Sequence, residues 1–94
     1  TMSREEFLQD RRTQQAVVMS LIIIGEAASK IINAWPDIKD TYPDIPWGAM
    51  RGMRNRIAHG YFAVDYGMVW DTVRDALPAL GQQLDLLLKE IQRP

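Results

Sequence analysis

The segment between Arg11 and Trp35 constrains the fold more than any other part of this chain, because it contains no proline and a long apolar pattern. Apolar residues at positions 17, 21, 24, 28, 31 and 35 recur at intervals of four and three, the spacing of one helical face. Further apolar residues at 18, 22 and 32 widen that face beyond what a lone surface helix needs. We therefore predict a long central helix that is covered on more than one side.

Short helices are predicted before and after this central helix. Ser3 and Glu6 have the spacing of a capping box, which predicts a helix from Arg4 to Gln9. Asp10 is positioned to cap the central helix, and Pro36 ends it. The loop that follows contains three prolines in the eleven residues 36–46, with room for one helical turn.

The second half of the chain is also predicted to be helical. The expected helices run from Trp47 to Ala58 with Asp44 or Ile45 as the cap, from Tyr66 to Leu77 with Asp65 as the cap, and from Ala79 to Gln92. Pro78 should kink the last pattern or restart it. Since no useful stretch alternates with period two, we predict an all-α fold, an antiparallel bundle of four to five helices.

The length of 94 residues indicates one domain spanning residues 1–94. A chain this short buries only roughly 60–65% of its unfolded surface, so part of its apolar surface should lie between subunits and we expect a dimer. The chain has no cysteine, which excludes disulfides and thiolate metal sites and fits a cytoplasmic location. Because the net charge is −1, any contact with nucleic acid must come from a local basic patch.

No membrane segment is predicted. The longest apolar run, AVVMSLIII, is interrupted by Ser20 and ends at Gly25, which makes it too short to span a bilayer. The first residues, TMSREEFLQDRR, lack the apolar core of a signal peptide.

The one histidine lies in the segment GMRNRIAHGYFAVD, Gly52 to Asp65. The polar residues gathered there are Arg54, Asn55, Arg56, His59 and Tyr61. Arg54 and His59 are five residues apart, about 140° around an ideal helix, so they converge only if the helix ends just before His59. Gly60 favours a bend at that point because glycine accepts positive φ. Asn55 and His59, four apart, should share one helical face.

This combination of side chains suggests cleavage of a phosphodiester. An imidazole exchanges a proton near neutral pH, and a guanidinium binds phosphate oxygens as a fork and stabilises developing charge. In RNA the neighbouring 2′-hydroxyl supplies the nucleophile, so neither a metal nor a cofactor is required. One imidazole cannot conveniently act as base and acid at once, which favours two copies of His59 facing across a two-fold axis. Arg51 and Arg56 would then line the shared cleft and bind substrate.

Their spacing alone favours a structural explanation of the same residues. A histidine at a helix end is often a C-terminal cap, and a nearby arginine is often a solvated ion-pair partner. Tyr61 is more often a half-buried aromatic than a functional hydroxyl. Glu26, set among apolar residues, either pairs with an arginine of the cluster or faces solvent. No metal constellation and no Gly-rich phosphate loop are present.

The pattern R-x-x-x-x-H-x-Y, formed by Arg54, His59 and Tyr61, resembles the HepT-like ribonuclease toxins of the HEPN superfamily. The flanking segments DRRTQQAVVMSLIIIGEAA, YPDIPWGAMRGMRNRIAHGYFAVD and VWDTVRDALPAL resemble that family in order and spacing. The resemblance implies a four- or five-helix bundle that dimerises to build a composite, metal-independent RNase site. It also implies that Arg54 and His59 are catalytic, with Asn55 as a supporting polar residue.

The resemblance further implies a partner, a minimal nucleotidyltransferase antitoxin that transfers AMP from ATP to Tyr61 and silences the RNase. A bulky, negatively charged adenylate beside the site would block RNA and occupy the arginines. Members of the family usually have a further helix before the region matching FLQDRRTQQAV, and this chain begins close to that region. We therefore expect the domain to lack the family's first helix.

Three functions remain in competition at this point. The leading one is an RNA endonuclease toxin, favoured by the presence of Arg54, His59 and Tyr61 together. The alternative is a non-catalytic HEPN subunit that binds a nucleotidyltransferase without cleaving RNA. The third is a helical dimerisation domain whose polar cluster is only a solvated helix end.

Overall fold

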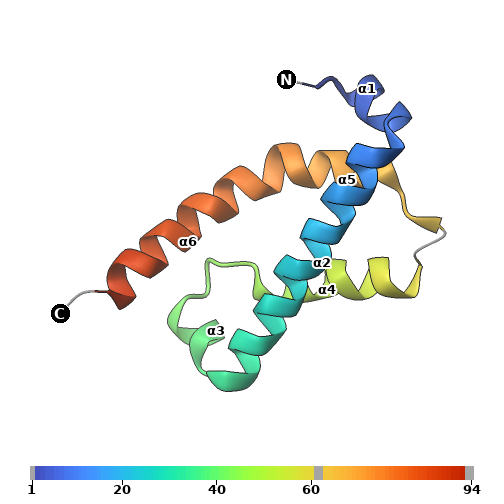
Figure 1. Ribbon diagram of the computed structural model, residues 1–94. Coiled ribbons are helices and arrows are strands. Elements are labelled where there is room, and N and C mark those ends of the chain that lie inside the picture. The colour runs from blue at the N-terminus through green and yellow to red at the C-terminus, as the bar shows by residue number, and fades with distance from the viewer. Residues whose placement is uncertain (1, 61–62, 93–94) are drawn as a thin grey trace.

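The computed structural model describes residues 2–60 and 63–92, and the regular structure of these residues is helical (Figure 1). The elements are α1 (Arg4–Gln9), α2 (Arg11–Ala34), α3 (Ile38–Thr41), α4 (Trp47–His59), α5 (Tyr66–Asp71), the π-helical segment η2 (Thr72–Ala76) and α6 (Leu77–Ile91). No strand occurs within the described residues, and the prediction of an all-α bundle is confirmed. The single helical turn expected in the proline-rich loop is α3.

The predicted caps of the first two helices are present. The Ser3 hydroxyl accepts from the Glu6 backbone N–H at 3.1 Å, and the Glu6 carboxylate accepts from the Ser3 N–H at 3.0 Å. These bonds to Ser3 hold the pKa of Glu6 below its ordinary value, and the backbone N–H of Thr13 does the same for the pKa of Asp10. The Glu6 and Asp10 carboxylates therefore stabilise the folded state at neutral pH. This contribution is lost in acid, as the pH falls through their lowered pKa values.

Helix α2 is the element on which the others assemble. Helix α4 crosses it with the most extensive contact, and α1 and α3 pack against its two ends. The buried residues of α2 are Gln14, Val18, Leu21, Gly25, Ala28 and Ile32. The predicted face is therefore partly wrong, since Ile31 and Trp35 are 39% and 38% exposed. Helix α4 packs directly over Gly25, and this rotates the buried stripe by about one residue from the predicted series.

Two groups of buried side chains form the core. The first contains Ala28, Ile32, Ile38, Ile45, Trp47, Met50, Leu80 and Leu87, and joins α2, α3, α4 and α6. The second contains Phe7, Val18, Leu21, Ile57 and Val69, and joins α1, α2, α4 and α5. Both groups include residues of α2 and α4, so the hydrophobic effect fixes the relative position of these two helices most firmly.

Helices α5 and α6 are joined through η2 into one continuous curved rod (Figure 1). Pro78 lacks an N–H, and its ring would clash with the Arg74 carbonyl in a regular α-helix. The backbone widens just before this proline: the Leu77 N–H bonds to the Thr72 carbonyl five residues earlier. The prediction that Pro78 kinks or restarts the helix is thus confirmed, and Asp65 caps α5 as expected through a 3.1 Å bond from the Met68 N–H.

One side of α2 remains exposed. Met19 and Ile23 are 56% and 59% exposed. The described residues therefore leave the side of α2 that carries Met19 and Ile23 uncovered. The Cα positions extend only 17 Å along the shortest axis, about two helical layers. By length and composition alone, α2 is long and apolar enough to cross a membrane, although its uninterrupted apolar run is short. Core helices of soluble proteins meet the same criterion.

Candidate functional site

Helix α4 carries most of the candidate residues, and its start is fixed by packing. The N-cap is Pro46, not Asp44 or Ile45 as predicted, and no side chain caps this end. The buried Trp47 donates its indole N–H to the Tyr42 carbonyl at 3.1 Å, which ties the first turn to the preceding loop. From there α4 contains three arginines, one histidine and no acidic residue, a local positive charge that the chain as a whole lacks.

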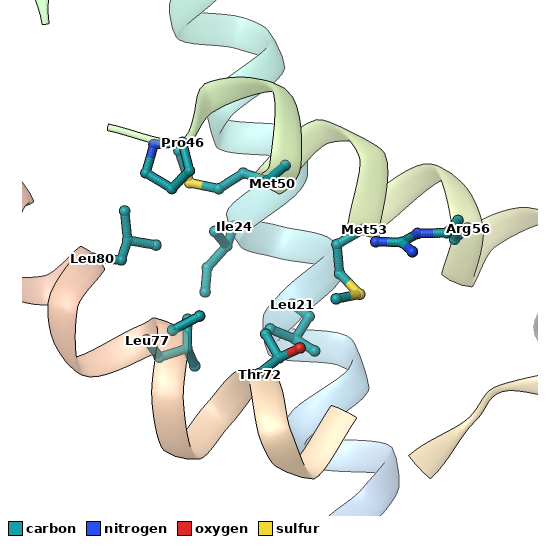
Figure 2. Close-up of a pocket in the computed structure, with 11 residues that line it drawn as sticks. Leu21, Ile24, Pro46, Met50, Met53, Arg56, Thr72, Leu77 and Leu80 are labelled. Carbon is teal, nitrogen blue, oxygen red and sulfur yellow. The ribbon is translucent and has the colours of Figure 1, made fainter. Parts of the chain in front are cut away.

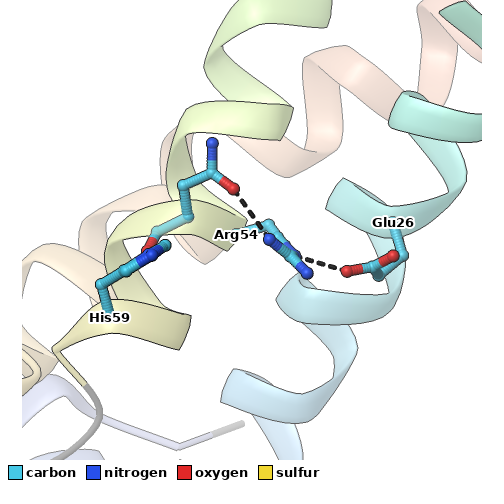
Figure 3. A network of polar contacts seen from close by, with 4 residues as sticks. Glu26, Arg54 and His59 are labelled. Atoms are coloured by element: carbon cyan, nitrogen blue, oxygen red, sulfur yellow. Dashed lines mark hydrogen bonds and ion pairs between the residues drawn. The ribbon is translucent and has the colours of Figure 1, made fainter. Parts of the chain in front are cut away.

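Arg54 is held in place by two acceptors. Its Nε donates to the Glu26 carboxylate on α2, and its Nη1 donates to Asn55 Oδ1 at 2.9 Å (Figure 3). Of the two possibilities for Glu26, the ion pair with an arginine is the one found. The side chains of Arg54 and Glu26 are 35% and 43% exposed, so water screens the pair and its main effect is orientation.

This arrangement leaves the outer edge of the guanidinium available. A guanidinium has five N–H groups, and Glu26 and Asn55 each take one. The remaining three lie on Nη1 and Nη2 and are bound by none of the described residues. Such an edge is the part of arginine that binds two oxygens of a phosphate.

His59 is the last residue of α4, and its tautomer is set by the helix. Its Nδ1 lies 2.8 Å from the Asn55 backbone oxygen. A carbonyl oxygen only accepts, so Nδ1 carries the proton of this bond. Nε2 is therefore the nitrogen of the neutral ring that can take a proton. The side chain is exposed, which makes Nε2 accessible to a ligand.

The expected bend between Arg54 and His59 is absent. Helix α4 continues through His59, and Gly60 has φ −124° and ψ 36°, outside the left-handed region. Arg54 and His59 therefore remain about 140° apart around the helix. Asn55 connects them instead, because its side-chain oxygen binds Arg54 and its backbone oxygen binds His59.

The other predicted residues are placed differently. Arg51 lies one turn before Arg54 on the same flank of α4, partly buried. Arg56 points to another side, about 200° from Arg54, where its Nη1 is 4.0 Å from Met68 Sδ. Figure 2 shows Arg56 at one end of an apolar pocket of about 180 Å³ between α2, α4 and the rod of α5 to α6. Tyr61, the predicted AMP acceptor, lies outside the described residues.

An apolar groove lies beside the polar cluster of α4. It has a volume of about 210 Å³ and is lined by Gln15, Val18, Met19 and Ile22 of α2 and by Ile57 and Ala58 of α4. Ala58 lies one turn after Arg54, so the groove adjoins the polar cluster. Val18 and Ile22 belong to the widened apolar face predicted for α2, whereas Met19 was not part of that face.

A metal site is not evident in the part of the chain that is described. Within residues 2–60 and 63–92, no three His, Asp or Glu side chains lie close enough to hold a metal ion. Chemistry without a metal remains a prediction that only a chelation experiment tests.

Comparison with known proteins places the chain in a family. Residues 1–87 match the family described as "Ribonuclease HepT-like". The chain is 44% identical over 85 residues to the protein named "Probable ribonuclease HepT" from Thermococcus cleftensis, covering 90% of this chain and 74% of that protein. It is 36% identical over 91 residues to a Methanocaldococcus jannaschii protein whose name proposes an RNase, covering 97% of this chain and 73% of that protein.

A third relative is similar over nearly the whole chain. A protein of Caldanaerobacter subterraneus, whose name also proposes an RNase, is 34% identical over 89 residues, covering 95% of this chain and 77% of that protein. No solved structure matches the chain. The sequence resemblance is confirmed by the family match and by these relatives: the chain belongs to the HepT-like ribonuclease family.

Proposed function

We propose that this chain is a metal-independent RNA endonuclease that acts as the toxin of a toxin–antitoxin pair. The observation that carries the proposal is the network around Asn55, whose side-chain oxygen holds the Arg54 guanidinium and whose backbone oxygen holds the His59 imidazole. The RNase names of the relatives support RNA as the substrate. Membership of the family supports the chemistry but does not assign the residues.

In the proposed reaction, the outer edge of Arg54 binds the scissile phosphate and stabilises the charge that builds on its oxygens. The 2′-oxygen attacks phosphorus and loses its proton to a base, while the bond from phosphorus to the 5′-oxygen breaks. An acid gives a proton to that 5′-oxygen. His59 exchanges these protons through Nε2, Asn55 holds both partners, and Glu26 supports Arg54. The products are a 2′,3′-cyclic phosphate and a 5′-hydroxyl.

The proposed active form is a homodimer. One protomer supplies one imidazole, whereas the reaction needs a base and an acid, so two copies of His59 in one cleft would divide the roles. The exposed Met19 and Ile23 and the adjoining apolar groove supply surface for such an interface. Arg51 and Arg56 of both chains would bind RNA around the cleft. A two-fold axis could bring the Arg56 residues toward the substrate although each lies away from its own Arg54.

The proposed regulatory partner is a minimal nucleotidyltransferase antitoxin, which would attach AMP to Tyr61. Tyr61 follows His59 by two residues, so the adenylate phosphate would lie close to the arginines of α4. An added negative charge would compete with the RNA phosphate for these arginines. We place both proteins in the cytoplasm, away from the membrane.

The experiment that tests this function incubates the purified protein with total RNA, with and without excess EDTA. We expect equal cleavage in both samples and fragments that end in 2′,3′-cyclic phosphate, because the nucleophile belongs to the RNA. A strict requirement for magnesium, or products that all carry 5′-phosphates, would contradict this chemistry. No cleavage of any RNA would favour the non-catalytic subunit that binds a nucleotidyltransferase.

A further inference from the structure

Gly25, in the middle of α2, lies where α4 passes closest. A Cβ atom placed on Gly25 would overlap the Cβ of Arg54 and would lie 2.8 Å from the Met50 backbone oxygen and 3.0 Å from the Arg54 Cγ. Real Cβ atoms essentially never approach other atoms closer than 3.0 Å. The Cβ of Arg54 and the oxygen of Met50 are fixed by the backbone of α4, so no change of rotamer removes the overlap. The two helices would have to move apart.

The residue after Gly25 is Glu26, which accepts the hydrogen bond from Arg54 Nε. Two consecutive residues of α2 therefore contact one arginine: the first provides space for its Cβ and Cγ, and the second holds its head group. We infer that Gly25 is a positioning residue for the reaction. Its missing side chain sets the distance between α2 and α4 at which Glu26 reaches Arg54 and the outer guanidinium edge stays available.

This inference rests on the proposed function of Arg54, and the other helical glycines supply a control. A Cβ at Gly48 or Gly52 of α4 would meet nothing within 4 Å. Alanine at Gly48 should therefore be tolerated and should favour the helix, since alanine is the better helix former. The same substitution at Gly25 forces a shift of the helix that carries Arg54.

The test compares RNA cleavage by Gly25→Ala and Gly48→Ala at a temperature where circular dichroism shows both to be folded. We expect Gly48→Ala to match the parent. Gly25→Ala should lower kcat by about tenfold to a hundredfold, because a displacement of about 1 Å at a reacting group has effects of that size. In an Arg54→Ala background the Gly25→Ala change should cause no further loss, since residues that act as one unit are not additive.

A parent-like rate for Gly25→Ala, or a full additional loss in the Arg54→Ala background, would overturn the inference. If Gly25→Ala does not fold, the double variant Gly25→Ala/Arg54→Gly decides. Folding of this double variant supports contact with Arg54 as the cause, whereas failure to fold beside a folded Arg54→Gly assigns the clash to the Met50 oxygen and overturns contact with Arg54 as the cause. A parent-like Arg54→Ala would overturn the proposed role of Arg54 as well, whereas a parent-like Gly25→Ala beside an inactive Arg54→Ala overturns only the role of Gly25.

Discussion

Replacing His59 with alanine is expected to lower the rate of RNA cleavage by about two to four orders of magnitude, the usual loss when a general acid or base is removed. The fold should be retained, because His59 is exposed at the end of α4 and its one hydrogen bond to a described residue is with the backbone of its own helix. Cleavage of a defined RNA under single-turnover conditions measures the loss, and thermal unfolding monitored by circular dichroism measures the stability.

The matched control is Gln92→Ala, which changes an equally terminal residue at the end of α6. That variant should cleave RNA at the parent rate. A rate for His59→Ala within tenfold of the parent would remove His59 from the mechanism. A large fall in the melting temperature of His59→Ala would mean that the residue is a structural cap, the alternative that its position on the helix had left open.

The second large effect is expected for Arg54→Lys. An ammonium is a compact charge and cannot bind Glu26, Asn55 and a phosphate with the fixed fork of a guanidinium. We expect kcat to fall by about a hundredfold or more, within the range seen when one transition-state donor is lost. Steady-state measurements that separate kcat from KM show whether the lost interaction belongs to the transition state or to RNA binding.

Arg74→Lys supplies the control for this change, because Arg74 is an exposed arginine of η2 on a different element. It should leave both kinetic constants unchanged. Full activity of Arg54→Lys would show that Arg54 contributes only positive charge. In that case the contacts with Glu26 and Asn55 would have no role in the chemistry.

Local features of the structure were predictable from the sequence. The capping box of Ser3 and Glu6, the Asp10 cap and the Asp65 cap each depend on residues three apart, and all are present. Pro78 was also informative, because its missing N–H affects its own helix. The pairing of Glu26 with an arginine followed in part from chemistry, since a carboxylate among apolar residues needs a partner.

Features that depend on contacts between helices were not predictable in the same way. A hydrophobic pattern does not count Gly25 as an apolar position. The close passage of α4 over this residue nevertheless decides which side of α2 is buried. The end of α4 was misplaced because Gly60 was expected to adopt a left-handed conformation, whereas its φ is −124°. The position of Arg56 beside Met68 depends on where α5 packs, which no spacing within α4 reveals.

A single protomer has only one imidazole for two proton transfers, so the proposed reaction depends on two chains sharing one site. Subunits carrying His59→Ala and unmodified subunits, each with a different affinity tag, should be mixed, allowed to exchange and purified through both tags. The mixed dimer keeps a single imidazole in the shared cleft, so it should have far less than half of the parent activity. Activity close to half of the parent value, in a preparation where both tags prove exchange, would contradict a composite site.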